Sequence, residues 1–342
     1  MTHYKLAFLG FGNVGRALAQ LLERKTSELK QRYDITFTAT GIATRSHGMV
    51  IEPDGIDLTT ALHTLRTGRS LALLNKIPVQ DTLEFIQKCG ADVLFENTPV
   101  NHVDGQPAVD HCRAALEKGM HIATANKGIV VFAYRELVEL ARSKGRKFYH
   151  ESTVMDGAPI FSLFRGALPA AKLLGFKGIL NSTTNLILTR MEEGESFDQA
   201  VRYAQQVGLA ETDPSADVDG WDSAIKVAAL VTVLMGTRFA PQQVERDGIR
   251  NITSEMVARA KTHGMRYKLV CSAEREAESI RARVAPELVP ADSPLYNIEG
   301  STSIIQFKTD VLGDLSITEA DPGPATTAYG LLADFINMVT GW

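Results

Sequence analysis

The sequence predicts an α/β fold, in which a doubly wound parallel sheet is followed by a second domain of α+β character. Between residues 4 and 152, short apolar or β-branched runs alternate with stretches of helical periodicity, which is typical of βαβ units. The expected strands of this part are 4–10, 35–43, 71–75, 93–97, 120–125 and 147–152. Its expected helices are 13–31, 105–118 and 132–144, the last of which ends at a lysine followed by a glycine.

The pattern changes after residue 152. A short run at 173–180 is followed by helices at 184–192, 197–207 and 222–236, and then by alternating runs at 267–273, 279–284, 302–308 and 314–318. These runs predict a mixed or antiparallel sheet. One more helix is expected at 328–338. We therefore expect a first domain at 1–150, completed by a C-terminal helix within 323–342, and a second domain at 151–322.

Composition narrows the function before any motif is considered. The chain has 342 residues, a formal charge of −4 and 44% hydrophobic residues, which suits about two globular domains and excludes disordered, collagenous and coiled-coil classes. The sequence has no block of like charges, so a nucleic-acid partner is not expected. The longest apolar run, 227–236, is too short to span a bilayer. Without a basic leader, and with three scattered cysteines, we expect a cytoplasmic protein with no disulfides and no membrane partner.

A glycine motif between the first strand and the first helix predicts a dinucleotide site. Gly10 permits a tight turn, Gly12 lets the backbone approach a pyrophosphate, and Gly15 lets helix and strand pack closely. Asn13 and Val14 open the helix, whose N-terminal N–H groups favour phosphate. The alternative is a glycine-rich turn without a cofactor. With the correct flanks, the motif favours a Rossmann-type domain for NAD or NADP.

The end of the second expected strand predicts which of the two cofactors binds. An acidic side chain there would bind the ribose 2′-hydroxyl of NAD, but residues 41–47 contain no acid. Arg45 could bind a 2′-phosphate through a charge-assisted pair, with Ser46 donating beside it. We therefore expect NADP, with NAD as the alternative if Arg45 is an ordinary surface residue.

Two lysines are candidates for proton transfer. Lys127 follows the strand 120–125, at the carboxyl edge where open α/β sheets bind ligands. Lys226 lies one turn after Asp222 on an otherwise apolar helix, so both side chains share one face. An isolated pair of this spacing is usually a solvated ion pair. Here an acid-rich loop precedes it, with Glu211, Asp213, Asp217 and Asp219, which favours a site for a zwitterionic amino acid.

Several motifs in order identify a resemblance to the homoserine dehydrogenase family, which interconverts aspartate 4-semialdehyde and homoserine. The matching segments are 10–15, 96–101, 125–128, 151–154 with 157–159, 178–185, 208–222, Lys226 and 327–328. The resemblance implies an oxidoreductase of threonine and methionine biosynthesis that forms a homodimer through the second domain's open sheet. The length leaves no room for the C-terminal regulatory ACT domain of many members, so we expect no threonine inhibition through such a module.

The resemblance also implies roles for individual residues. Lys127 and Lys226 are the catalytic residues, and Thr183, Glu211, Asp217 and Asp222 bind the substrate. Cofactor contacts fall on Gly10, Gly12, Asn13, Val14, Gly15, Arg45, Ser46, Asn97, Thr98 and Lys127. Within this set our hypothesis is that Glu211 and Thr183 bind the amino group, that Asp222 and Lys226 orient the reacting hydroxyl, and that Lys127 lies by the nicotinamide.

A sodium site is implied by the segment 151–158, mainly through backbone oxygens around Glu151, Val154, Asp156 and Ala158. The sequence departs from the family at Met155 and Asp156, where small residues are usual, and at Ser182, where glycine is common. These departures leave open a paralogous dehydrogenase for a related small hydroxy amino acid or semialdehyde. An alternative of a different class is a nucleotide-binding regulatory protein without catalytic activity, against which the two lysines and the acid-rich loop speak.

Overall fold

The computed structural model describes residues 1–277 and 279–341, and two compact units divide them. The first unit comprises residues 1–162 and the chain from Gly323 onward, and the second comprises residues 163–322. Each unit is described by itself.

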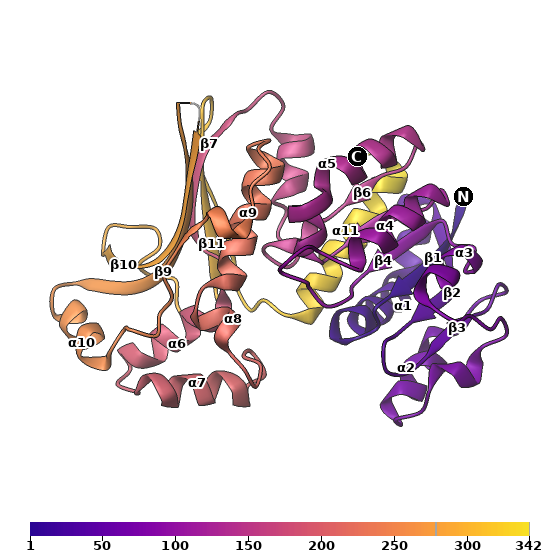
Figure 1. The fold of residues 1–342 in the computed structure, drawn as a ribbon, viewed down its shortest axis with the longest axis horizontal. Helices are drawn as coiled ribbons and strands as arrows, with labels where there is room; N and C mark the ends of the chain where they lie inside the picture. The colour runs from indigo at the N-terminus through magenta and orange to yellow at the C-terminus, as the bar shows by residue number, and fades with distance from the viewer. Residues whose placement is uncertain (278, 342) are drawn as a thin grey trace. The chain divides into compact units, whose positions relative to one another are not determined.

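The first unit is built on a six-stranded sheet with the order β3-β2-β1-β4-β5-β6 (Figure 1). All neighbouring strands pair in parallel except β3, which is antiparallel to β2. The strand order reverses direction between β1 and β4, which is where open α/β sheets bind ligands. The strands are β1 (Thr2–Leu9), β2 (Ile35–Ala43), β3 (Met49–Ile51), β4 (Val93–Glu96), β5 (His121–Thr124) and β6 (Phe148–Tyr149).

Helices cover this sheet, and the last helix of the chain returns to it. The rings of Phe8 on β1, Phe95 on β4 and Phe335 pack together, with centroids 5.4 Å and 6.1 Å apart along this series. The C-terminal helix therefore belongs to the core of the first unit. The helices of this unit are α1 (Asn13–Tyr33), α2 (Leu58–Arg66), α3 (Thr82–Lys88), α4 (Ala108–Glu117), α5 (Lys127–Ser143) and α11 (Pro324–Thr340).

One expected strand is wrong, and the helix expected at 132–144 starts five residues earlier. The run 71–75 forms a 3-10 helix, Leu71–Leu74, because the Ser70 hydroxyl accepts a hydrogen bond from the Ala72 N–H at 3.2 Å and begins a turn. Its Leu73 side chain is 74% exposed, which a buried central strand would not allow. The helix expected at 132–144 begins at Lys127, because the Asn126 side chain caps it by accepting from the Gly128 N–H at 3.1 Å.

The first unit extends beyond residue 150 to Ser162. The Glu151 N–H donates to Asp334 Oδ2 on α11 at 2.7 Å, and the Glu151 carboxylate accepts the N–H groups of Phe161 at 2.6 Å and Ser162 at 2.8 Å. The Ser152 hydroxyl also donates to the Thr327 carbonyl at 2.7 Å. These bonds keep the segment 151–162 with α11, so the division of the chain falls later than the sequence suggests.

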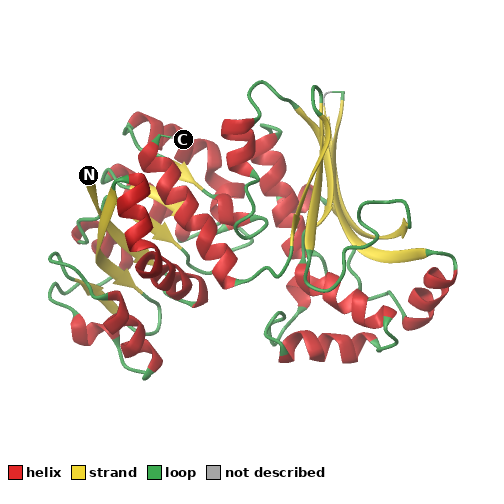
Figure 2. Ribbon diagram, turned by 180° about the vertical axis from the view of Figure 1, so that it is seen from behind, coloured by secondary structure: helices red, strands yellow, loops and turns green. Residues whose placement is uncertain are grey.

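The second unit contains a mixed six-stranded sheet with the order β12-β11-β7-β9-β10-β8, in which only β8 pairs in parallel. Figure 2 shows its long strands in yellow. The strands are β7 (Leu173–Ile179), β8 (Glu245–Arg246), β9 (Met265–Glu276), β10 (Ser279–Pro290), β11 (Ser303–Thr309) and β12 (Gly313–Glu319). The helices are α6 (Ser182–Glu192), α7 (Phe197–Gln206), α8 (Ser215–Val218), α9 (Trp221–Leu234) and α10 (Ser254–Thr262).

The apolar helix α9 packs on β9 and β10 and buries the middle of the second unit. Its mean hydropathy is high, yet it is too short for a bilayer. In the part of the chain that the structure describes, no helix is long and apolar enough to cross a membrane.

Candidate active site

The glycine loop after β1 has the backbone shape that a dinucleotide requires. Gly10 has φ +87°, and a Cβ there would overlap the backbone of Asn97 and lie 2.9 Å from the Thr98 nitrogen. A Cβ on Gly15 would lie 2.6 Å from the Gly10 carbonyl oxygen. At Gly12 a Cβ would meet nothing within 4 Å. Gly10 and Gly15 are therefore needed for packing, and Gly12 leaves open space beside the turn.

The start of α1 is suited to bind an anion. Its N-cap is Gly12, which offers no side chain to the N–H groups of the first turn, and that turn holds no acidic residue. Asn13 is exposed and Val14 half-buried at this end. Uncapped N–H groups and the helix dipole suit a pyrophosphate, so these residues fit a dinucleotide.

Asn97 and Thr98 follow β4, at the switch between β1 and β4. Both polar atoms of the Asn97 amide are buried, and neither has a hydrogen-bond partner among the described residues. A buried amide without partners is costly unless a ligand supplies them. Asn97 therefore fits the polar part of a nicotinamide nucleotide.

A buried acid joins the ends of β4 and β5. Glu96 has no exposed surface, and it accepts hydrogen bonds from the Thr98 N–H at 3.0 Å, from the Thr98 hydroxyl, and from the Thr124 hydroxyl at 2.9 Å. Burial raises the pKa of Glu96 to about 7, although these hydrogen bonds oppose the shift. The Thr124 hydroxyl in turn accepts the Asn126 N–H at 2.9 Å.

This network sets the backbone that carries Lys127. Asn126 donates through Nδ2 to the Thr98 carbonyl at 3.2 Å and caps α5, and Lys127 is the first residue of that helix. The Lys127 side chain is half-buried. Glu96 was not predicted from the sequence, although it lies within the segment 96–101 that carries the resemblance. An acid ending a buried parallel strand is the signal that could have identified it.

Arg45 and Ser46 lie at the carboxyl end of β2, where both are exposed. The Thr44 hydroxyl shapes this turn by accepting the His47 N–H at 2.8 Å and donating to the Gly48 carbonyl at 2.9 Å. The Ser46 hydroxyl lies 2.8 Å from Nδ1 of His47. The turn thus presents a guanidinium and small polar groups to solvent.

In the second unit, Asp222 and Lys226 form a partly buried ion pair. Lys226 Nζ lies 3.1 Å from Asp222 Oδ2 and donates to the Leu180 carbonyl at 2.7 Å. Their side chains are 17% and 16% exposed, respectively. This pair is not the solvated surface pair that the spacing alone allows, because it is anchored to the backbone ahead of α6.

Asn181 brings Asp217 and Asp222 together, and the sequence analysis did not select it. Its Nδ2 donates to Asp217 Oδ1 at 2.7 Å and to Asp222 Oδ2 at 3.0 Å. Its Oδ1 accepts the Thr184 N–H at 2.8 Å and so caps α6. An asparagine between a strand and a helix predicts a cap, but nothing local in the sequence predicts its two acidic partners.

Of the remaining predicted substrate residues, Thr183 lies at the same end of α6. Thr183 is buried in the first turn, and its hydroxyl donates to the Leu209 carbonyl at 3.1 Å. A hydroxyl that donates to a carbonyl keeps its lone pairs for another donor, such as an ammonium. Glu211, two residues after Leu209, has an exposed side chain.

The sequence analysis takes the acids of the loop 211–219 as one set, but in the structure they form two groups with different partners. Asp219 is held by the Arg250 guanidinium, with one of its two bonds at 3.1 Å. Asp213 accepts the Ser215 N–H at 3.0 Å, and this bond holds the pKa of Asp213 below its usual value. These two acids fix the loop, whereas Asp217 joins the Asn181 network.

The segment expected to bind sodium is fastened to α11. Asp156 has φ +38°, a conformation that favours glycine, and its Oδ2 accepts the Thr326 hydroxyl at 3.0 Å. This explains why glycine suits the position and how aspartate is tolerated. Met155 is buried, and the Ser182 hydroxyl lies 3.4 Å from the Ser303 hydroxyl on β11. Among the described residues, no group of three or more His, Cys, Asp or Glu side chains could hold a metal ion.

A Rossmann-like unit with a dinucleotide loop, joined in one chain to a unit with a lysine and carboxylate network, defines an NAD(P)-dependent oxidoreductase acting on a CH–OH group. The family model described as "Homoserine dehydrogenase, NAD binding domain" matches residues 10–151, and that described as "Homoserine dehydrogenase" matches residues 159–336. The chain belongs to the homoserine dehydrogenase family.

Relatives agree with this assignment over nearly their whole length. The chain is 38% identical over 340 residues to the NAD(+)-dependent homoserine dehydrogenase of Pseudomonas canavaninivorans, covering 99% of this chain and 97% of that one. It is 36% identical to the homoserine dehydrogenase of Methanocaldococcus jannaschii, covering 97% and 98%.

Solved structures agree as well. The crystal structure of a putative homoserine dehydrogenase from Archaeoglobus fulgidus has a TM-score of 0.87 and 32% identity, covering 98% of each chain. A hyperthermophilic archaeal homoserine dehydrogenase mutant in complex with NADPH has a TM-score of 0.84 and 28% identity, covering 100% of this chain and 99% of that one.

Proposed function

We propose that this chain is an NADP-dependent homoserine dehydrogenase that transfers hydride reversibly between L-homoserine and aspartate 4-semialdehyde. The observation that carries the proposal is the network of Asp217, Asn181, Asp222 and Lys226 at the start of α6 and α9. It combines two carboxylates, which can bind a cationic group, with one ammonium, which can donate to a hydroxyl oxygen. A substrate with both an ammonium and a hydroxyl matches that combination.

The substrate's ammonium would bind Asp217, Glu211 and the lone pairs of Thr183. Asp217 is fixed by Asn181, and the Thr183 hydroxyl already donates its proton to Leu209. The hydroxyl of the substrate would lie against Asp222 and Lys226. Because Lys226 Nζ is 3.1 Å from Asp222 Oδ2, the Asp222 carboxylate could orient both the lysine and the hydroxyl. The resemblance to the family, in which these positions line the substrate pocket, supports this division.

A lysine would take the hydroxyl proton. The nicotinamide cofactor supplies the hydride acceptor when bound, and the chain must accept a proton from the alcohol or return one to the aldehyde. Lys226 meets the alcohol through Asp222, whereas Lys127 stands at the first helical position after β5. We assign proton transfer to these two residues.

The lysine variants test this mechanism. Lys226→Ala and Lys127→Ala should each lower kcat by about 100-fold or more, the usual contribution of general acid–base catalysis. Homoserine-dependent reduction of NADP measures kcat, and cofactor binding by fluorescence serves as the control for the first unit. If one variant keeps near-normal turnover, the role assigned to that lysine is wrong. Lys261→Ala, an exposed lysine on α10, is the matched control.

For the cofactor we propose NADP, through Arg45 and Ser46. The support is an exposed guanidinium at the end of β2 and a turn, residues 44–48, without an acid to repel a 2′-phosphate. The relatives named for their cofactor include one NAD(+)-dependent enzyme and one bound to NADPH, so the choice rests on this turn.

We also propose a sodium ion beside residues 151–158. Both Glu151 oxygens accept backbone N–H groups and Asp156 accepts Thr326, so the carbonyls of Val154 and Ala158 would supply much of the ligand set. Replacing sodium by choline in the assay tests this: activity should fall, and unchanged activity would contradict it.

A further inference from the structure

Asn181 uses its side chain in two different ways. It is 4% exposed, between β7 and α6, and its Oδ1 accepts the Thr184 N–H at 2.8 Å. Its Nδ2 lies 2.7 Å from Asp217 Oδ1 and 3.0 Å from Asp222 Oδ2. The oxygen therefore serves the helix, and the nitrogen serves two acids from α8 and α9.

The orientation of this amide is fixed by its partners. The Thr184 N–H can only donate, so it requires the oxygen. The opposite orientation would place Oδ1 against two carboxylates and leave the Thr184 N–H facing an amino group. In the observed orientation, each N–H of the amide can donate to one acid.

The two acids need these donors. Two carboxylates within hydrogen-bonding distance of one nitrogen repel each other, and that repulsion favours protonation of one of them. Lys226 offsets the charge of Asp222 at 3.1 Å. Asp217 receives the shorter of the two amide bonds, at 2.7 Å.

We propose that Asn181 is a positioning residue of the reaction, whose two N–H donors hold the carboxyl groups of Asp217 and Asp222 oriented for the substrate. The inference rests on the proposed function and deepens it, because it assigns the geometry of both substrate-binding acids to one neutral side chain. Asn181 needs no contact with substrate for this role.

Two substitutions separate this role from the helix cap. Asparagine, aspartate and serine are comparable N-caps, so Asn181→Asp and Asn181→Ser both keep an acceptor for the Thr184 N–H. Both lose the amide donors. Asn181→Asp also places a third carboxyl group beside the two acids.

The variants should differ in their pH profiles. In Asn181→Asp, one carboxyl group of the three takes up a proton, and its single O–H replaces part of the lost bonding. As the pH rises this proton is lost, so kcat/KM relative to wild type should fall by a further factor of about 10 between about pH 6 and 9. In Asn181→Ser the loss should be about tenfold at every pH.

The charged and titratable groups facing Asn181 in the second unit are Asp217 on α8, Asp222 and Lys226 on α9, and Cys271 on β9, which lies by Leu180 and Lys226. Burial raises the pKa of Cys271 to about 11, so its thiol stays neutral across this range. The pH effect in the aspartate variant therefore belongs to the carboxyl groups.

The experiment measures kcat and KM for L-homoserine over the same pH range in wild type, both variants and Thr253→Asp. Thr253 is the exposed N-cap of α10, so this control adds a carboxylate at another cap of the same unit. We expect both Asn181 variants to have a higher KM, a lower kcat and the same thermal unfolding temperature as the wild type. In Thr253→Asp, kcat and KM should equal those of the wild type.

The outcomes are separable. If the wild type oxidises homoserine and both Asn181 variants keep kcat/KM within twofold at every pH, the inference is overturned and the proposed function stands. If the wild type does not oxidise homoserine, the proposed function fails first. If one variant unfolds, the other decides the question by the same comparison.

Discussion

The environment of a single residue can give it properties that its type alone does not predict, and Glu96 is an example. Glu96 is an acid without exposed surface, and it connects the Thr98 loop to Thr124. Its pKa is raised from 4.5 to about 7, mainly by burial. Folding therefore favours the protonated acid, and the stability linked to Glu96 depends on pH.

Glu96→Gln should remove this dependence. Because the folded-state pKa is the higher one, the stabilising contribution is fully present below pH 4.5 and is lost as the pH rises to about 7. Relative to the Glu96→Gln variant, wild type should lose up to about 3 kcal/mol of unfolding free energy across this window. Urea unfolding at about pH 5 and about pH 8 measures the difference, with exposed Glu139→Gln as the control. A difference independent of pH would contradict the assignment.

Arg45 is the residue proposed to bind the 2′-phosphate of NADP. Arg45→Ala should raise the KM for NADP about tenfold or more and leave the KM for NAD nearly unchanged, because only NADP carries the 2′-phosphate. Steady-state kinetics with both cofactors make the measurement, and Arg69→Ala, also exposed in the first unit, is a matched control. An unchanged KM for NADP would refute the proposed preference.

At the scale of elements, α11 packs closely against the segment 151–157 of the first unit, and this packing contributes to stability. Gly330 lies in the middle of α11, and a Cβ there would lie 2.9 Å from the Asp156 carbonyl oxygen and 3.0 Å from Gly157 Cα. Its nearest neighbour would be the Ser152 hydroxyl. Two of these three atoms are backbone and cannot rotate away.

Gly330→Ala should destabilise the protein despite the better helix propensity of alanine. The propensity gain is about 1 kcal/mol, and overpacking costs about 1–3 kcal/mol, so we expect a net loss of up to about 2 kcal/mol in unfolding free energy. Combining it with Ser152→Ala removes the nearest atom, so the double variant should lose less than the sum of the two. A stabilising Gly330→Ala would show that α11 packs less closely.

Elements were predictable where periodicity and glycine placement agree. β1, α1 and β2 follow directly from the apolar runs and the Gly10–Gly15 loop, and α11 from the apolar spacing of its core face. The run 71–75 was misjudged because its leucine and alanine residues are equally compatible with a capped 3-10 turn. The short β3 and the helices α2, α3 and α10 carry too few periodic residues to be recognised.

The site was predictable where a motif lies within one element. The Asp222 and Lys226 pair follows from helical spacing, and it is present at 3.1 Å. Asn181 was missed because its acidic partners come from two other helices, and the separation of Asp219 from Asp217 depends on Arg250, later in the chain. Such contacts depend on tertiary packing, which local patterns do not encode.

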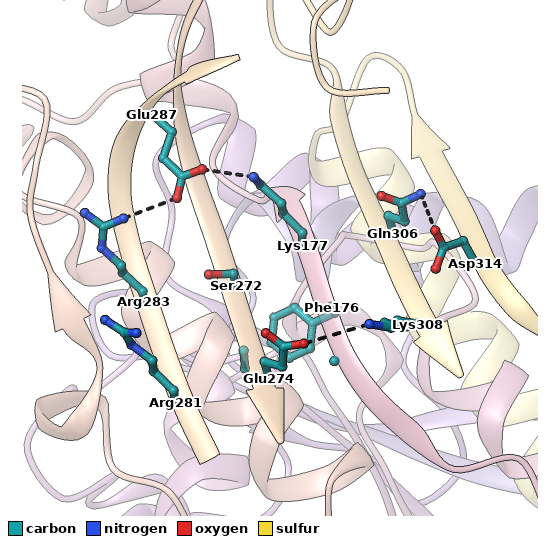
Figure 3. A pocket seen from close by; sticks show the side chains of 12 residues that line it. Phe176, Lys177, Ser272, Glu274, Arg281, Arg283, Glu287, Gln306, Lys308 and Asp314 are labelled. Atoms are coloured by element: carbon teal, nitrogen blue, oxygen red, sulfur yellow. Dashed lines mark hydrogen bonds and ion pairs between the residues drawn. The ribbon is translucent and has the colours of Figure 1, made fainter. Parts of the chain in front are cut away.

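At the scale of the whole molecule, one face of the second sheet carries charged and polar side chains around a cavity. Cys271 faces the layer of α9 and Lys226, so Ser272, the next residue on β9, points to the opposite face. Figure 3 shows that face, with a cavity of about 450 Å³ between β12 and β10. None of the predicted site residues lines it.

This face is polar but internally paired. Lys177 lies 2.9 Å from Glu287, which is also 3.4 Å from Arg283, and Gln306 lies 3.5 Å from Asp314 (Figure 3). Paired charges reduce the cost of covering a polar surface. We propose that a second copy of the chain covers this face, as the family resemblance implies. Light scattering should give twice the 37.3 kDa chain mass, and a monomer would refute the proposal.

The proposed homoserine dehydrogenase activity can be measured as substrate specificity. The purified protein should be assayed with NADP and L-homoserine, and with a panel of related small hydroxy amino acids under the same conditions. We predict that kcat/KM for L-homoserine exceeds that for every panel member by about tenfold or more, because one methylene or one misplaced polar group costs at least that factor. A panel member that exceeds homoserine tenfold would indicate a paralogous dehydrogenase, and tight NADPH binding without turnover on any substrate would indicate a regulatory protein. Either result would refute the proposed homoserine dehydrogenase activity.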